Sequence, residues 1–216
     1  MYRNGIKRLL AVVLSLCGMV CLSWLFLILA IAIKIDSPGP VFFKQKRVGI
    51  GKKHFYILKF RTMRIDTPHD MPTHLLHDPD QYITRMGHFL RKTSLDELPQ
   101  LINILRGDMS FIGPRPERPE IIAQYTEVMP EFAFRMKVKA GLAGFAQVYG
   151  KYNTSPYDKL KLDLTYIENY SVWLDLKLML LTLKVLFWPD STEGVESEQV
   201  TAFKAEYDGR AEKDDN

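Results

Sequence analysis

The sequence predicts an α+β fold that is mostly helical, with an N-terminal membrane-inserted helix followed by a compact cytosolic domain. Three observations predict this class. An uncharged apolar run covers residues 9–33, a cluster of β-forming residues surrounds Gly49-Ile50-Gly51, and amphipathic segments at helical spacing fill much of the remaining chain. At 216 residues the chain is long enough for one domain with its own core.

The apolar run forms the first element. At about 1.5 Å per residue, a helix over residues 9–33 is long enough to cross a bilayer core. The run leads into "KIDSPGP" and not into a small-residue cleavage site, which argues against a removed signal peptide. Basic residues flank both of its ends, so both ends are expected in the cytoplasm. We therefore expect a re-entrant helix over residues 1–35 that bends near Ser15, Gly18 or Ser23, with a straight span as the alternative.

Cysteine usage and charge limit the function further. Cys17 and Cys21 lie one helical turn apart inside the apolar run, where a disulfide is implausible and packing as small apolar residues is expected. The net charge of +4, with basic residues concentrated after the run, fits a surface that faces anionic headgroups or a phosphorylated substrate. Nothing resembles a DNA- or RNA-binding motif, so we expect no nucleic-acid partner.

Residues 36–188 are predicted to form one domain. A turn at 36–40 precedes a β-hairpin over 41–63, and the proline-containing segment 66–80 is expected to be a loop. That loop carries His69, His74 and His77, whose spacing matches no standard zinc signature.

Helical patterns dominate the rest of the domain. Helices are expected over 81–92, over 96–107 with Gly107 as its end, and over 118–139 with an interruption at Pro130. Residues 140–152 are expected to be a strand and loop, and a helix capped by Ser155 should follow. Residues 173–188 are apolar but carry Asp175, which predicts a helix in the membrane interface or on the core. Residues 189–216 are expected to form a poorly ordered tail.

The stretch "TSLDELPQLINILRGDMSFIGPRP", residues 93–116, allows two interpretations. Ser94 and Glu97 fit the S-x-x-E capping box of a helix start. This explanation does not account for Asp96, for the preceding Arg91, or for the proline-bracketed Arg115. An acid pair at a helix N-terminus can also hold phosphate or a metal, and the planar donor fork of an arginine matches phosphate oxygens. Composition and spacing leave both interpretations open.

A succession of motifs carries a resemblance to a known family. "DSPGPVFFKQKRVG", "KFRTM", "LRKTSLDELPQLINILRGDMSFIGPRP", "GLAGFAQVYG" and "KLDLTYIENYSVWLDLKLML" occur in this order. Together they resemble the bacterial sugar transferase family, the monotopic polyprenyl-phosphate phosphoglycosyl transferases. The resemblance extends from the membrane segment to about Trp188, and the chain looks like the minimal form of the family.

The resemblance implies an activity and its partners. A sugar-1-phosphate would move from a UDP-sugar to polyprenyl phosphate, usually undecaprenyl phosphate, with release of UMP, as the initiating step of glycoconjugate synthesis. The location implied is the cytoplasmic face of the bacterial inner membrane, in contact with membrane lipid. Whether the chain forms a homodimer is left open.

The resemblance also implies roles for individual residues. Asp96 matches the family's nucleophile, which forms a covalent phosphosugar-aspartate, and Glu97 matches the residue that holds the cofactor Mg²⁺. Arg91 and Arg115 match arginines expected near the phosphates. Five further positions match polar residues of the family's site, with a solvated surface or a salt bridge as the alternative for each: Lys59, Arg61, Lys151, Asp163 and, as a weaker match, Asp175.

The sequence departs from the family pattern at three positions. Ser23 is followed by Trp24 in place of proline, Ala140 stands where proline is common, and Lys151 stands where arginine is usual. The first departure makes a spanning helix harder to exclude, and the last removes a bidentate donor.

Two other functions are considered. A conventional glycosyltransferase would release UDP, but the chain has no Rossmann-type glycine motif. A non-catalytic membrane scaffold is the second alternative, and the intact pair Asp96 and Glu97 argues against it.

Overall fold

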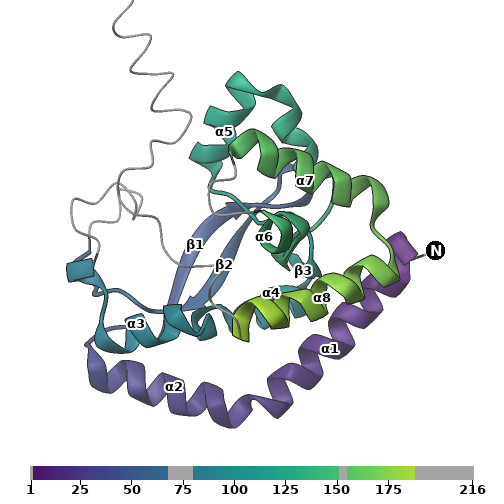
Figure 1. The fold of residues 1–216 in the computed structure, drawn as a ribbon. Helices are drawn as coiled ribbons and strands as arrows, with labels where there is room; N and C mark the ends of the chain where they lie inside the picture. The colour runs from purple at the N-terminus through teal and green to yellow at the C-terminus, as the bar shows by residue number, and fades with distance from the viewer. Residues whose placement is uncertain (1, 68–79, 151–154, 188–216) are drawn as a thin grey trace, which may run out of the picture.

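The computed structural model describes residues 2–67, 80–150 and 155–187 of the chain. It is mostly helical with two small β-pairs, which confirms the α+β prediction (Figure 1). The predicted tail, the three loop histidines and Lys151 lie outside the described residues. The helices and strands are α1 (Lys7–Cys21), α2 (Ser23–Asp36), β1 (Phe42–Val48), β2 (His54–Phe60), α3 (Arg85–Lys92), α4 (Gln100–Arg106), β3 (Met109–Ile112), α5 (Pro119–Val128), β4 (Ala140–Ala143), α6 (Phe145–Tyr149), α7 (Pro156–Asn169) and α8 (Val172–Phe187).

The apolar N-terminal run is two helices and not one. α1 and α2 meet at Leu22 with a bend of 62°. The bend lies beside Ser23, one of the predicted weak points, whose hydroxyl donates a hydrogen bond of 2.8 Å to the carbonyl of Val20. Among the described helices none is by itself long and apolar enough to cross a membrane, and only this bent pair meets the criteria jointly. Cys17 and Cys21 are free thiols on its exposed surface.

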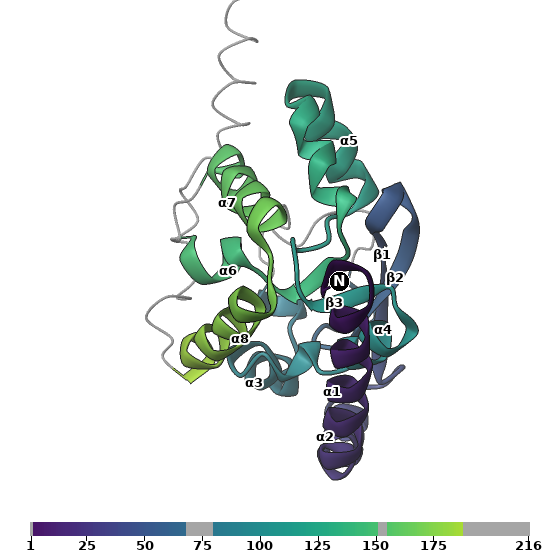
Figure 2. The ribbon, with the colours of Figure 1, turned by 90° about the vertical axis from the view of Figure 1, so that its right-hand side faces the viewer.

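Both ends of the bent pair are attached to the same body of the protein. At the start of α1, the ammonium group of Lys7 lies 2.8 Å from Asp175 of α8, and Arg8 donates to the carbonyl of Leu105 at the end of α4 at 2.7 Å. At the end of α2, Asp36 accepts a hydrogen bond of 2.9 Å from the backbone of Met86 in α3. The two helices therefore form a shallow V along one side of the domain (Figure 1), which Figure 2 shows edge-on.

The predicted hairpin is confirmed. β1 and β2 pair antiparallel, with Phe42 opposite Phe60 and Val48 opposite His54. β2 is the buried strand, because Phe55, Ile57 and Phe60 are at most 9% exposed. Its side chains pack against α1, α2 and α4, so β2 is fixed at the centre of the domain.

A second β-pair was not expected in full. β3 and β4 pair parallel, with Met109 opposite Ala140 and Ile112 opposite Ala143. The predicted strand and loop over 140–152 is right for β4 but wrong for residues 145–149, which form helix α6. β3 was missed because a four-residue strand gives no measurable alternation of apolar and polar residues.

The remaining predicted helices are present with shifted ends. The interruption at Pro130 separates α5 from a 3₁₀ segment, Pro130–Lys137. Ser155 caps α7, since its hydroxyl accepts a hydrogen bond of 3.1 Å from the backbone of Asp158. α8 buries Asp175 and Leu178 against the domain, while Trp173 is 82% exposed.

Candidate active site

Asp96 and Glu97 lie in a 3₁₀ turn, Leu95–Glu97, immediately before α4. The capping-box interpretation is wrong. Ser94 adopts a left-handed conformation with φ of 55°, and its side chain caps no backbone amide. The backbone N–H of Glu97 instead donates to the carbonyl of Ser94 at 3.2 Å, so the Glu97 side chain is free of the helix start. The turn presents both carboxylates together.

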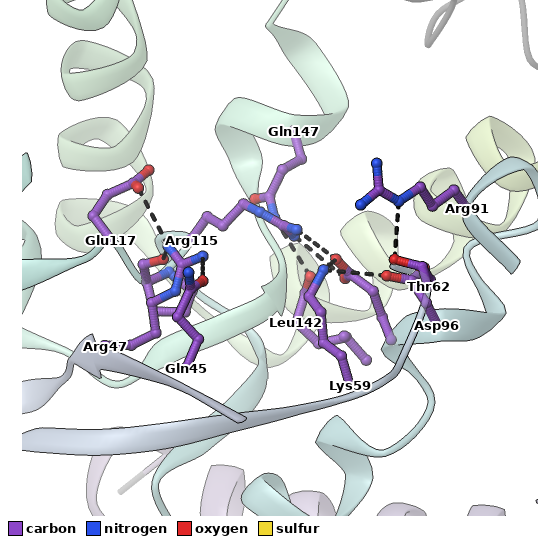
Figure 3. A network of polar contacts seen from close by, with 12 residues as sticks. Gln45, Arg47, Lys59, Thr62, Arg91, Asp96, Arg115, Glu117, Leu142 and Gln147 are labelled. Atoms are coloured by element: carbon purple, nitrogen blue, oxygen red, sulfur yellow. Dashed lines mark hydrogen bonds and ion pairs between the residues drawn. The ribbon is translucent and has the colours of Figure 1, made fainter. Parts of the chain in front are cut away.

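Two cations from separate elements contact this acid pair (Figure 3). Lys59 of β2 bridges the pair, with its Nζ 2.7 Å from Glu97 Oε1 and 3.3 Å from Asp96 Oδ2. Arg115, from the loop after β3, donates to both oxygens of Glu97 in a bidentate pair. The Arg115 side chain is 41% exposed whereas that of Asp96 is 11% exposed, so the cluster opens to solvent on the Arg115 side.

A third cation approaches Asp96 from the end of α3. The Nε of Arg91 donates a hydrogen bond of 3.0 Å to the hydroxyl of Thr62, and Figure 3 draws this pair on the Asp96 side of the network. The charge of Arg91 acts to lower the pKa of Asp96 against the effect of burial. Three cations thus surround two carboxylates, an arrangement suited to a ligand that carries several negative charges.

The backbone around Arg115 is held from two sides. Gly113 N–H donates to the carbonyl of Ala143 at 2.9 Å, and Gly141 N–H donates to the carbonyl of Pro114 at 3.0 Å. Arg135 then donates to the carbonyl of Arg115 itself at 3.0 Å. The arginine side chain therefore projects from a fixed backbone.

The two carboxyl groups differ in their proton affinity although they are adjacent. Burial raises the pKa of Asp96 above its ordinary value of 3.8, and the opposing charge of Lys59 only partly offsets this. Burial alone would also raise the pKa of Glu97, but Arg115 and Lys59 together lower it to about 2. Glu97 is therefore a firmly ionised partner for cations, while Asp96 is the more basic of the two.

The structure does not bring every predicted site residue into this cluster. The guanidinium of Arg61 donates to the carbonyls of Pro38 and Ser37, the latter at 2.7 Å, and so holds the segment after α2. Asp175 accepts hydrogen bonds from Tyr166 at 2.6 Å and from Tyr2, and it pairs with Lys7. The partners of Arg61 and of Asp175 are therefore groups that hold the fold together.

Asp163 lies one step behind the cluster. Its carboxylate accepts a hydrogen bond of 2.7 Å from Arg135, and both side chains are at most 9% exposed. Because Arg135 also binds the Arg115 carbonyl, Asp163 acts on the cluster through Arg135. The salt-bridge alternative therefore describes Asp163 better than direct contact with substrate.

Sequence reasoning missed three residues that shape the site. Thr62 contacts Arg91, Arg135 supports Arg115, and Asn103 joins α4 to β2 by accepting from the Leu58 amide at 2.9 Å and donating to the Tyr56 carbonyl at 2.8 Å. Thr62 is part of the "KFRTM" motif, and Asn103 is a polar residue on the apolar side of a predicted helix. The motif and the polar residue on an apolar helix face were the features of the sequence that could have identified Thr62 and Asn103.

The described residues contain no group of three or more His, Cys, Asp or Glu side chains that could hold a metal ion. The oxygens of Glu97 nonetheless suit Mg²⁺, which prefers hard oxygen ligands and often takes only one or two carboxylates plus substrate phosphates. The low pKa of Glu97, about 2, keeps this ligand ionised.

Comparison with known proteins agrees with the motif order. The model of the bacterial sugar transferase family matches residues 2–189. The chain is 40% identical over 181 residues to the UDP-glucose:undecaprenyl-phosphate glucose-1-phosphate transferase of Xanthomonas campestris pv. campestris, covering 82% of this chain and 37% of that protein. It is 39% identical over 184 residues to the UDP-N-acetylgalactosamine-undecaprenyl-phosphate N-acetylgalactosaminephosphotransferase of Aeromonas hydrophila, covering 84% and 43%.

A relative of similar length is the uncharacterized sugar transferase EpsL of Bacillus subtilis (strain 168). It is 39% identical over 199 residues, which cover 91% of this chain and 94% of the relative. The chain spans only about two fifths of the length of the first two relatives. The family match nevertheless covers nearly every residue described above, so the chain belongs to the bacterial sugar transferase family.

Proposed function

We propose that this protein transfers a sugar-1-phosphate from a UDP-sugar to a polyprenyl phosphate, with release of UMP, through a covalent intermediate on Asp96. The observation that carries the proposal is the arrangement of Lys59, Arg91 and Arg115 around Asp96 and Glu97. The named relatives that act on undecaprenyl phosphate with UDP-glucose or UDP-N-acetylgalactosamine support it.

The proposed reaction has two displacements at one phosphorus. An oxygen of ionised Asp96 attacks the phosphorus that bears the sugar, and the bond from this phosphorus to the UMP oxygen breaks. An oxygen of the polyprenyl phosphate then attacks the same phosphorus and releases the Asp96 carboxylate. The product is a polyprenyl diphosphate sugar, and the bulky nucleotide and lipid need never occupy the site together.

The cations reduce the cost of bringing an anionic nucleophile to an anionic diphosphate. Arg91 and Lys59 are close to Asp96, where charge develops on the phosphoryl group that is transferred. Arg115 is partly exposed and can offer its guanidinium to the departing nucleotide phosphate. Mg²⁺ held by Glu97 would add neutralising charge on the diphosphate.

Attachment to the cytoplasmic side of the bacterial inner membrane through a re-entrant helix completes the proposal. Both ends of the α1–α2 pair bind the domain that carries Asp96, at Lys7 and at Asp36. The pair exposes a wide apolar surface, which includes Leu16, Val20, Trp24 and Leu27. A bent helix with both ends on one face would leave the site at headgroup level, where polyprenyl phosphate and a cytosolic UDP-sugar both arrive.

The test uses purified protein in nanodiscs with Mg²⁺, undecaprenyl phosphate and a panel of UDP-sugars, and it quantifies UMP and UDP separately. We expect UMP from at least one sugar, with release abolished by Asp96→Asn and unchanged by Asp66→Asn, since the Asp66 side chain is 55% exposed and pairs with Arg64. Release of UDP would support a conventional glycosyltransferase instead. Undiminished UMP release by Asp96→Asn would contradict the covalent intermediate.

A further inference from the structure

We propose that Thr62 is a positioning residue of this reaction, whose hydroxyl holds the guanidinium of Arg91 beside the carboxylate of Asp96. The inference rests on the proposed function of Asp96. It gives a role to a side chain that is 9% exposed, touches neither carboxylate through a described contact, and binds an arginine whose charge acts on Asp96.

The contact itself is specific. Arg91 donates from Nε to Thr62 Oγ1 at 3.0 Å, and among the described residues this is the one hydrogen bond that its side chain makes. Figure 3 shows no contact of the other two guanidinium nitrogens with the residues drawn. The hydroxyl thus fixes the direction of the planar group while both Nη atoms remain available to phosphate oxygens.

The backbone of Thr62 fixes the helix that carries Arg91. Its carbonyl accepts a hydrogen bond of 3.0 Å from the amide of Thr84, and the Thr84 hydroxyl caps α3 by accepting from Gly87 at 2.9 Å. A β-carbon at Gly87 would collide with the Thr62 carbonyl, so α3 lies directly on this residue. Thr62 therefore docks the start of α3 through its backbone and orients Arg91, in the last turn of the same helix, through its hydroxyl.

Because the backbone and the hydroxyl of Thr62 make separate contacts, the role of the hydroxyl can be tested by itself. Thr62→Val keeps the shape and the backbone contacts but removes the acceptor, which frees Arg91 to rotate toward solvent. Thr62→Ser keeps the acceptor. Thr67→Val is the matched control, because Thr67 is also 9% exposed and its hydroxyl also makes a hydrogen bond, to the carbonyl of Arg64.

Release of Arg91 should weaken the hold of the site on phosphate. The other cations at the acid pair, Lys59 from β2 and Arg115 from the loop after β3, are both paired with Glu97. The Nη atoms of Arg91 make no hydrogen bond to a described residue, so they can donate to phosphate oxygens. If Arg91 rotates away, these donors leave the site.

The first measurement is the kinetics of UMP release by the three variants at pH 7.5. We expect Thr62→Val to lower kcat about tenfold, because a hydrogen bond to a charged group is lost. Thr62→Ser should restore kcat, and Thr67→Val should match wild type. In an Arg91→Ala background, Thr62→Val should have no further effect.

The second measurement separates this inference from the proposed function. Binding of inorganic pyrophosphate is measured by calorimetry without any sugar or lipid. About tenfold weaker binding by Thr62→Val, with wild-type binding by Thr62→Ser and Thr67→Val, supports the positioning role even if no sugar is turned over. Equal pyrophosphate affinity and equal kcat for Thr62→Val and wild type would overturn it.

Discussion

At the scale of single residues, the adjacent carboxylates are suited to different tasks in the proposed reaction. Glu97 is held by Arg115 and Lys59, which lower its pKa to about 2, so it stays ionised across physiological pH. Burial disfavours the charged form of Asp96 more strongly than Lys59 and Arg91 favour it, so the pKa of Asp96 is raised. A carboxylate of higher pKa is the better nucleophile of the two, and the ionised neighbour is the better ligand for a cation.

The buried charge of Asp96 is expected to cost stability. Its pKa in the folded state is raised above its unfolded value, so ionised Asp96 destabilises the fold at neutral pH, and this cost disappears as the pH falls below the raised pKa. Asp96→Asn should therefore abolish UMP release and unfold at the same temperature as wild type or up to about 4 °C higher. Thermal unfolding at pH 7.5 checks this, and a clearly lower midpoint would show that Asp96 supports the fold.

Lys59 is expected to control the acid limb of the pH profile. Its ammonium group lies 3.3 Å from Asp96 and lowers the pKa of that carboxyl. Lys59→Met should move the acid limb of kcat/KM for UMP release to higher pH, while Lys59→Arg should move it less because the charge remains. The exposed Lys161, which pairs with Asp158 on α7, provides the control Lys161→Met. A profile of Lys59→Met that overlays wild type would contradict this assignment.

At the scale of elements, the site is assembled by connections between short segments. Asn103 is fully buried in α4 and binds the β2 backbone on both sides of Ile57, as a neighbouring strand would. It therefore fixes α4, which follows the acid pair, relative to the strand that carries Lys59. In the same way, backbone hydrogen bonds to β4 fix the loop that carries Arg115.

The β4 contact depends on glycine. A β-carbon at Gly141 would lie less than 3.0 Å from the backbone of Gly113 and of Ala143. The backbone segments therefore lie too close together for a residue with a side chain at position 141. Gly141→Ala should displace the loop of Arg115, lower UMP release at least tenfold, and lower the unfolding temperature by about 4–8 °C. Gly5→Ala is the control, since nothing lies within 4 Å of a β-carbon there. Wild-type activity of Gly141→Ala would show that this contact does not position Arg115.

At the scale of the whole molecule, exposed apolar residues gather on the bent helix pair and on one face of α8. Trp173, Leu176, Leu180 and Leu183 recur at intervals of three and four residues along α8 and are all at least 41% exposed. The start of α8 lies beside the start of α1, where Asp175 pairs with Lys7, and both helices lie in the lower half of Figure 1. This distribution is the one that the proposed membrane attachment requires.

Labelling can decide between a re-entrant and a spanning helix. Single cysteines are placed before the bent pair by Gly5→Cys and after it by Lys44→Cys, each combined with Cys17→Ser and Cys21→Ser; both positions are exposed. We expect a membrane-impermeant maleimide to modify both in inverted inner-membrane vesicles and neither in spheroplasts. If Gly5→Cys reacts in spheroplasts and Lys44→Cys does not, the helix spans the membrane, and the proposed attachment is contradicted.

The sequence predicted those parts of the fold that depend on local chemistry. The hairpin around Gly49-Ile50-Gly51, the helix end at Gly107 and the cap at Ser155 follow from preferences that act within a few residues, and the structure has all three. β3 and α6 were missed, because strands and helices of four or five residues are set by the segments they pack against.

The sequence by itself determined the family, the acid pair and the basic residues that accompany it, because these are fixed by motif order and residue type. Only the tertiary structure decided that Ser94 does not cap α4, that Arg61 and Asp175 bind structural partners, and that Thr62 reaches Arg91. For the contacts of Arg61, Asp175 and Thr62, the physical reason is distance along the chain. Thr62 and Arg91 are 29 residues apart, and such a contact is set by how β2 and α3 pack, which no local pattern records.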